Sequence, residues 1–265
     1  MKANFHTHTP RCQHASGTEE EYARAAAEAG FEVLGFSDHC PWPYRTGYVS
    51  RIRMTCEELD GYIAAVHRVR EEWAGRLRVC LGMEAEYYPD YVDHLRRMRD
   101  QGIDYYLLGQ HAMNSEEYPG QWTASACEED DDSVLRFADS ITEGVRTGLY
   151  ACVAHPDIYL RRRPPERFNR ACEEAADRIA QVCIEQNIPV EFNLLGLDCR
   201  KRGESNCYPV PAFWQYLSRW KVKTIIGVDA HDPALLGRAD LWQEGMDTLT
   251  SLGFEVLDRL PVKGV

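Results

Sequence analysis

Histidines gather in a few short segments of this chain, mostly just after an apolar run. Two carboxylates, Glu84 and Asp229, occupy equivalent places. Imidazole and carboxylate groups that converge from several strand ends commonly hold metal ions. The pattern therefore predicts a metal centre. Seven of the nine histidines belong to it: His6, His8, His14, His39, His111, His155 and His231.

The spacing within these segments supports a shared site. His6 and His8 are two residues apart, as are Asp229 and His231. Alternate residues of a strand point to the same side, so both members of a pair would face one cavity. One such pair is weak evidence, since buried histidines are often simply hydrogen-bonded. Many polar side chains at buried strand ends would each cost free energy unless a common partner satisfied them, which favours metal.

The segments that must position these residues alternate between strand and helix patterns. Apolar runs such as VLGFSDH and KTIIGVDAH alternate with helices, the first two of which begin at T-x-x-E capping boxes at Thr18 and Thr55. This order indicates an α/β fold with a parallel sheet, whose active site lies at the carboxyl ends of the strands. We predict a TIM-barrel-like (β/α) barrel of about seven strands in one domain over residues 1–265. GFEVLDRL is a candidate short final strand.

Composition narrows the function further. The 265 residues carry a formal net charge of −12, which argues against nucleic acid as a partner but not against a small phosphorylated substrate. No apolar run approaches the ~18 residues that span a bilayer, and the first motif at His6 leaves no room for a signal peptide. The ten cysteines are scattered and show no framework spacing, so we expect reduced thiols and a cytoplasmic protein.

In chain order the segments read HxH, DH, GxE, GxH, AHP and DAH. On these motifs, from FHTHTPRCQHASG to GVDAHDPALLG, the chain resembles the polymerase and histidinol phosphatase (PHP) family, and within it the stand-alone histidinol-phosphate phosphatases. The resemblance implies a distorted seven-stranded barrel with up to three metals. It implies three ligand sets: His6, His8, Glu84 and Asp229 for the first metal; Glu84, His111 and His155 for the second; His14, His39 and His231 for the third.

The ligand types agree with this resemblance. Mixed imidazole and carboxylate ligation suits zinc, manganese or iron better than magnesium or calcium. Three divalent ions would exceed the charge of two carboxylates, leaving room for a bridging hydroxide and a phosphate dianion. We expect hydrolysis of L-histidinol phosphate to L-histidinol and phosphate, a step of histidine biosynthesis, by attack of a metal-bridging hydroxide. The predicted catalytic residues are Glu84, Asp229, Asp38 and His39.

Several neighbours of these residues have open roles. Asp38 could orient an imidazole, help to hold the third metal, act as a general acid or simply cap a strand end. Glu86 shares a strand face with Glu84 and competes with it for the bridging role, although the GxE spacing of the family favours Glu84. Cys12 and Cys40 adjoin predicted ligands, and we expect them to support those ligands or to be inert.

Phosphate recognition needs donors besides metal, and the arginine fork is suited to it. Arg161, with Arg162 and Arg163 beside it, follows the AHP segment, and Arg200 follows VEFN; each could equally be a surface residue. Asn193 matches an E-x-N segment that lies near the substrate in the phosphatases, whereas Glu191 could be structural. We predict that Asn193, Arg161 and Arg200 bind substrate.

One position departs from the family pattern. Close relatives often read N-x-x-G-L-R, whereas this chain has Asp198 in place of the arginine. Either Arg200 substitutes from two residues further along, or the pocket accepts another small phosphate ester or a nucleotide. A non-catalytic metal-binding module is the alternative from a different class. The five lysines lie away from the carboxyl ends of predicted strands, which disfavours an amidohydrolase with a carbamylated lysine. His67 and His94 are left out of the site.

Overall fold

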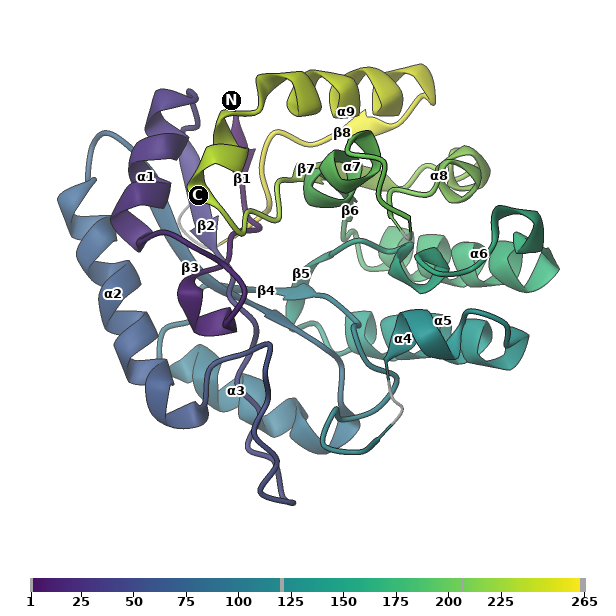
Figure 1. Ribbon diagram of the computed structural model, residues 1–265, viewed down its shortest axis with the longest axis horizontal. Helices are drawn as coiled ribbons and strands as arrows, with labels where there is room; N and C mark the ends of the chain where they lie inside the picture. Colours follow the sequence, from purple (N-terminus) through teal and green to yellow (C-terminus); the bar gives the residue numbers. More distant parts are fainter. Residues whose placement is uncertain (1, 120–121, 206, 263–265) are drawn as a thin grey trace.

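The computed structural model describes residues 2–119, 122–205 and 207–262. Within this part, eight parallel strands are hydrogen-bonded in chain order, and helices surround them (Figure 1). The predicted α/β fold with a parallel sheet is confirmed. The strands are β1 (Ala3–Asn4), β2 (Val33–Phe36), β3 (Arg78–Ala85), β4 (Tyr105–Leu108), β5 (Tyr150–Val153), β6 (Val190–Asn193), β7 (Lys223–Gly227) and β8 (Glu255–Val256).

The helices begin where the capping signals predict. Thr18 accepts a hydrogen bond from the backbone of Glu21, whose side chain accepts one in return, and this box starts α1. The box at Thr55 starts a short 3-10 turn that continues into α2. Among the described residues, no helix combines the length and apolarity that crossing a bilayer requires. The helices are α1 (Glu19–Glu28), α2 (Leu59–Glu72), α3 (Val92–Asp100), α4 (Thr123–Ala126), α5 (Asp131–Arg146), α6 (Arg170–Glu185), α7 (Leu194–Lys201), α8 (Pro211–Leu217) and α9 (Ala239–Ser251).

The sheet curls into a distorted barrel. The segments that follow β1 and β7 meet at a parallel bridge between Thr7 and Ala230, and the backbone N–H of His8 donates to the carbonyl of Ala230 at 2.9 Å. The two-residue strand β8 pairs only with the start of β7. The sequence predicts about seven strands and a short final one in GFEVLDRL, and the structure has both, since β8 lies in that segment.

Two apolar layers hold the barrel together. The larger one packs helices against the outward-facing residues of the strands. The smaller one fills the interior near the amino ends of the strands, because alternate residues of each strand point inward. It consists of Ala3, Phe5, Val33, Cys80, Tyr105, Leu107, Cys152, Ala154, Ile225, Leu260 and Val262. The opposite, carboxyl end of the same interior is polar, and it contains the predicted site.

Candidate metal centre

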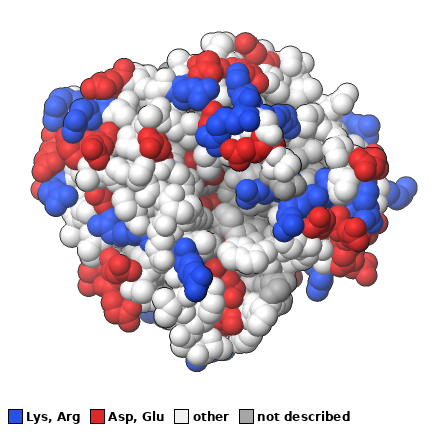
Figure 2. Space-filling model, in the orientation of Figure 1, with Lys and Arg blue, Asp and Glu red and all other residues white. Residues whose placement is uncertain are grey.

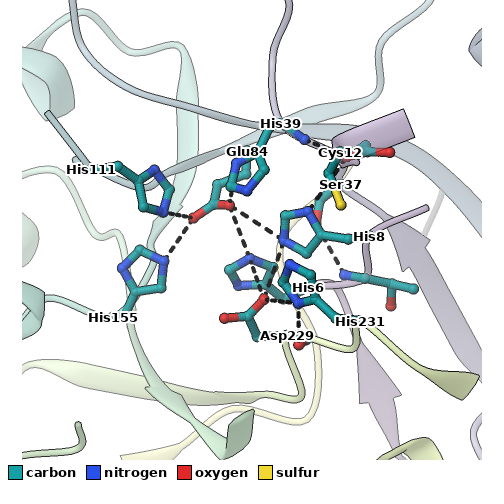
Figure 3. Close-up of polar contacts among 12 residues, drawn as sticks. His6, His8, Cys12, Ser37, His39, Glu84, His111, His155, Asp229 and His231 are labelled. Atoms are coloured by element: carbon teal, nitrogen blue, oxygen red, sulfur yellow. Dashed lines mark hydrogen bonds and ion pairs between the residues drawn. The ribbon is translucent and has the colours of Figure 1, made fainter. Parts of the chain in front are cut away.

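All nine predicted metal ligands lie around the carboxyl ends of the strands, and Figure 3 labels eight of them, all except His14. Glu84 belongs to β3, whereas the histidines and Asp229 come from segments that continue beyond the paired strands. The expectation that the pairs His6/His8 and Asp229/His231 lie within strands is therefore wrong. β1 ends at Asn4 and β7 at Gly227, so each pair follows the end of its strand. His155 and Asp229 instead adopt left-handed backbone angles, φ 28° and 53°. Such conformations are strained in non-glycine residues and are typical of functional sites.

The inner cluster consists of His6, His8, Glu84 and Asp229, all at most 3% exposed. The Nε2 atoms of the two histidines lie 3.2–3.5 Å from Glu84 Oε2 and Asp229 Oδ1. Four tetrahedral ligands at about 2.0–2.2 Å from zinc would lie roughly 3.3–3.6 Å apart. The observed N···O separations are close to this range, and His6, His8 and Asp229 together form one group whose ligand atoms lie close enough to hold a metal ion.

The second oxygen of Glu84 faces another pair of imidazoles. Its Oε1 atom lies 2.7 Å from His155 Nε2 and 3.3 Å from His111 Nε2. Figure 3 shows the Glu84 carboxylate between His111 and His155 on one side and the histidines of the inner cluster on the other. Gly109 makes room for it, because a Cβ atom there would collide with the carboxylate. Glu84 is thus placed to bridge two metal positions.

The rim cluster consists of His14, His39 and His231, whose ring nitrogens lie within 4.8 Å of one another. The Nε2 atoms of His14 and His231 are 3.0 Å apart. His14 is exposed and His39 is buried. The cluster contains no carboxylate, unlike the inner one. Cys12 is also within ligand reach of His8 and His231, although burial raises the pKa of its thiol to about 12.

Electrostatics favour positive charge in the inner cluster. Burial disfavours a charged imidazole, but the carboxylates of Asp229, Glu191 and Glu84 outweigh it and raise the pKa of His6 well above its usual value. The same balance raises the pKa of His8 to about 9. Burial disfavours ionised carboxylates too, yet the surrounding histidines hold the pKa of Glu84 and Asp229 well below the usual range. A cation is therefore stabilised at this position.

Unsatisfied buried atoms point the same way. Buried polar atoms normally have a hydrogen-bond partner. Seven buried atoms of the predicted ligands have none within the described part of the chain, and a metal would use several of them. They are His6 Nε2, His8 Nδ1, His8 Nε2, His39 Nδ1, Glu84 Oε2, His155 Nδ1 and Asp229 Oδ1. The clustered residues can hold divalent metal ions.

Glu191 and Asn193 support the inner ligands from β6. Glu191 Oε1 lies 2.7 Å from His6 Nδ1, and its Oε2 accepts from the backbone N–H of His155. Asn193 donates to Asp229 Oδ2 at 3.0 Å, and its own oxygen caps α7 at Gly196. The supporting role of Glu191 was not predicted. Its only signal was the two-residue spacing from Asn193, which could not identify His6 as the partner.

Glu86 and Asp38 lie behind the ligands. Glu86 Oε1 is 3.0 Å from His111 Nδ1, so it faces that ring from the side opposite Glu84 and is not between the metal positions. Asp38 is fully buried, lies 3.5 Å from His8 Nδ1 and accepts from the backbone N–H groups of Thr9 and His39. The geometry favours orienting roles for both carboxylates.

A cavity of about 330 Å³ opens above the ligands. Figure 2 shows a hollow near the middle of this face, with basic side chains beside it. Arg161 and Tyr208 line the cavity, and the Arg161 guanidinium lies 5.9 Å from the centre of the Tyr208 ring. The remaining lining residues are His14, His39, Ile52, Glu84, His111, Ile158, Leu195, Gly196, Cys199, Glu204, Cys207, Asp229 and His231.

The other predicted substrate-binding residues do not line this cavity. Arg200 donates to the carbonyl of Pro209, and Asn193 is buried beneath Asp229. Asp198 is also directed elsewhere, because it accepts hydrogen bonds from Arg202 and Arg238 at 2.8 and 2.7 Å. The departure from the family pattern at Asp198 therefore places no carboxylate in the cavity wall.

Further candidates likewise lie outside the cavity lining. Arg162 contacts Ser125 and Glu128, and Arg163 is buried against the carbonyls of Cys127 and Arg167. His94 contacts the carbonyl of Pro41. Cys40, which adjoins the predicted ligand His39, does not line the cavity either, and neither does His67.

The chain has clear relatives. The PHP domain family matches residues 4–194. A probable histidinol-phosphatase from Deinococcus radiodurans is 32% identical over 239 residues, which cover 88% of this chain and 87% of that protein. The histidinol-phosphatase of Bacillus subtilis is 24% identical over 261 residues, covering 90% of this chain and 97% of that protein. The sequence similarity thus extends beyond the part matched by the family.

A solved structure shares the fold. The histidinol phosphate phosphatase of Lactococcus lactis, crystallised with zinc, L-histidinol and phosphate, gives a TM-score of 0.70. The likeness covers 97% of this chain and 95% of that chain at 15% sequence identity. At this identity the similarity concerns the arrangement of strands and helices.

Proposed function

Because the chain belongs to the PHP domain family, we propose that it is a metal-dependent phosphomonoesterase that hydrolyses L-histidinol phosphate to L-histidinol and phosphate in histidine biosynthesis. The observation that carries the proposal is the inner cluster. There the Nε2 atoms of both histidines lie 3.2–3.5 Å from one oxygen of Glu84 and one oxygen of Asp229. The names of the relatives in Deinococcus radiodurans and Bacillus subtilis support the substrate.

We propose three divalent ions, with zinc, manganese or iron as candidates. His6, His8, Glu84 and Asp229 would hold the first, and Glu84 would share the second with His111 and His155. The rim cluster of His14, His39 and His231 would hold the third. Bound there, the ions would acidify water at neutral pH and offset phosphate charge. The zinc in the related Lactococcus lactis structure supports this metal class.

The side chains around the cavity would select the substrate. Arg161 stands at its wall and would donate to phosphate oxygens, where an arginine fork binds strongly. Ile52, Ile158 and Leu195 give the same wall an apolar surface suited to a small organic leaving group. We assign Asn193 and Asp38 to orienting Asp229 and His8 and not to substrate contact.

The rest of the chain fits this proposal. Asp229 and His231 lie outside the family match, yet β7 pairs with β6 in the same sheet, which supports one domain over residues 1–265. All ten cysteines are unpaired, and seven are buried. Free thiols of this kind are usual in a reducing compartment, so we propose a cytoplasmic enzyme with a small-molecule partner.

The direct test is phosphate release from L-histidinol phosphate by the manganese- or zinc-loaded protein, compared with an aryl phosphate and several nucleotides. We expect strong preference for histidinol phosphate. Turnover of the aryl ester alone would keep the phosphomonoesterase chemistry and reject the substrate. No turnover of any ester by a fully loaded protein would favour a non-catalytic metal-binding module.

A neighbouring pair of arginines tests the phosphate contact. Arg161→Met should lower kcat/KM by about 10–100-fold, because a hydrogen bond to a charged group contributes about 1.5–3 kcal/mol. Arg162→Met is the matched control, since Arg162 contacts Ser125 and Glu128 outside the cavity. Equal effects of the two substitutions would contradict the role given to Arg161.

A further inference from the structure

A buried arginine lies behind the metal centre in the segment between β2 and α2. Arg53 is 1% exposed, and its guanidinium forms a two-pronged contact with Glu86 at 2.9 and 3.2 Å. The same group donates to Glu116 Oε1 at 2.8 Å and to the carbonyl of Cys40 at 2.9 Å. A buried charge is costly unless it is paired and hydrogen-bonded, and Arg53 meets both conditions.

The carboxylate that Arg53 holds is the one that contacts a predicted ligand. Glu86 Oε1 lies between Arg53 Nη2 and His111 Nδ1, at 2.9 and 3.0 Å. Glu86 Oε2 also accepts from the indole N–H of Trp42 at 3.0 Å. On its other side, the His111 ring presents Nε2 to Glu84 Oε1 at 3.3 Å. A continuous chain of contacts therefore joins Arg53 to the carboxylate between the metal positions.

This chain of contacts determines which nitrogen of His111 is available. When Nδ1 donates its hydrogen to Glu86, Nε2 carries the lone pair and faces Glu84. Partners of this kind orient metal-binding histidines, and their loss commonly weakens metal binding about 10–100-fold. A carboxylate gripped at both oxygens by a planar guanidinium cannot rotate away from the imidazole without breaking that grip.

We propose that Arg53 is a positioning residue for the second metal position, acting through Glu86 on His111. The inference rests on the proposed function only in taking Glu84, His111 and His155 as that metal's ligands. Arg53 touches neither the cavity nor a ligand directly. Through Glu86 it fixes His111, whereas Glu191 holds His6 in the inner cluster by direct contact.

The segment that carries Arg53 is itself hydrogen-bonded to the segment that follows His111. Glu117 Oε2 accepts from the backbone N–H groups of Arg45 and Thr46 at 3.0 Å, and Glu116 accepts from the hydroxyl of Tyr44. Glu116 also accepts from Arg53, which in turn holds Glu86. The conformation of residues 44–53 and the position of Glu86 are therefore linked. Metal held by His111 should therefore depend on this segment being in place.

The test measures metal directly. Bound metal per chain and its retention against increasing chelator are determined for wild type, Arg53→Met, Arg53→Lys, Glu86→Gln and the Arg53→Met/Glu86→Gln double variant. Arg53→Met should weaken retention of one ion about 10–100-fold while the others stay bound. Arg53→Lys keeps the charge but not the planar fork, and should weaken it less. Circular dichroism checks that each variant is folded.

The double variant separates positioning from general structural damage. If Arg53 acts through Glu86, adding Arg53→Met to Glu86→Gln should change retention little further, because residues of one network are not additive. Independent, additive losses would overturn the proposal, as would unchanged retention in Arg53→Met. Arg45→Met is the control, since Arg45 is in the same segment but pairs with exposed Asp90.

The outcomes distinguish this inference from the proposed function. A wild-type protein that retains no divalent metal at all would reject the metal-dependent phosphatase. A wild-type protein that holds its metals, with an Arg53→Met variant that holds them equally well, would reject only the positioning role.

Discussion

The inner and rim clusters of the candidate centre are built from similar imidazoles but differ in charge. The inner one combines His6 and His8 with the carboxylates of Glu84 and Asp229, and is almost completely buried. The rim one has three histidines and no carboxylate, and His14 is exposed. Partial desolvation of the His14 ring and the nearby His231 lower the pKa of His14, whereas carboxylates raise the pKa of His8 to about 9.

The supports of the two clusters differ as well. Glu191 and Asn193 hold the inner ligands from β6. At the rim, His14 Nδ1 contacts a neutral carbonyl, that of Cys12, at 2.6 Å. His231 Nδ1 lies 3.1 Å from the carbonyl of Asp229 and 3.3 Å from its carboxylate, and His39 Nδ1 lies 3.1 Å from Glu84 Oε2, so His14 is the rim ligand with the neutral support. A charged support strengthens an imidazole ligand more than a neutral carbonyl does. The same residue type can thus make a tight and a weak metal position in one protein, and we expect the rim to release metal first.

The largest effect should come from Glu84, which the first and second proposed metal positions would share. Glu84→Gln removes the bridging charge and should lower kcat/KM by about 1,000-fold or more, since metals contribute several kcal/mol to such reactions. Metal content should fall with it. Elemental analysis and the phosphatase assay check both. The exposed Glu185→Gln, on α6, is the control. A Glu84→Gln protein with full activity and metal content would refute the bridging assignment.

A smaller effect is expected from the support of the inner cluster. Glu191→Gln keeps the shape of the side chain but removes the charge facing His6, and should weaken metal affinity about 10–100-fold. Glu191 packs directly against Gly227, where a Cβ atom would collide with its carboxylate. Competition with a chelator measures the affinity. An unchanged affinity would show that the charge on Glu191 is irrelevant.

The rim should be separable from the inner cluster. His14→Ala should remove one ion while the others remain bound, and activity should fall less than in Glu84→Gln. Stepwise chelation of the wild type should release an ion first from the same position. Metal counts after each step, with the exposed Arg24→Ala on α1 as control, measure this. Loss of all metal at once would contradict the distinction between the clusters.

The mildest test is the pH dependence of stability without metal. Burial disfavours charge on His8 and His111, but carboxylates raise their pKa to about 9 and 10, above about 6.5 in the unfolded chain. Their stabilising contribution is complete below about pH 6.5 and lost as pH rises through 9–10. The Tm of the metal-free protein should therefore fall over this range.

Metal should reverse this trend, because binding displaces those protons and strengthens as pH rises. Thermal unfolding at pH 6, 7.5, 9 and 10, with and without chelator, compares the two forms. If Tm changed with pH in the same way with and without metal, the raised pKa values of His8 and His111 would not govern metal binding.

Local signals in the sequence were sufficient to predict the framework. The capping boxes at Thr18 and Thr55 act over three residues, so their consequence can be read directly. Apolar runs between helices predicted a parallel sheet with polar residues at one end, which the structure confirms. Because strands of such a sheet all end on the same side, the convergence of His6 and Asp229 followed without knowledge of their contacts.

Side-chain partners far apart in the chain were beyond this reasoning. Glu191 and His6, or Arg53 and Glu116, are paired only by the curvature of the sheet and the path of loops. Arg200 was predicted to bind substrate because it follows β6, yet the rotation of α7 directs it to Pro209. Tyr208 had no signal, since an aromatic residue in a loop is more often simple packing.

The junction between Thr7 and Ala230 has a consequence for how the protein is made. Strands paired in chain order can join the growing sheet one after another as they are synthesised. The inner cluster, however, has His6 from the start of the chain and Asp229 from near its end. A nascent or truncated chain therefore presents its first histidines and Glu84 without the last carboxylate, and the first proposed metal position is complete only after the seventh strand has been made.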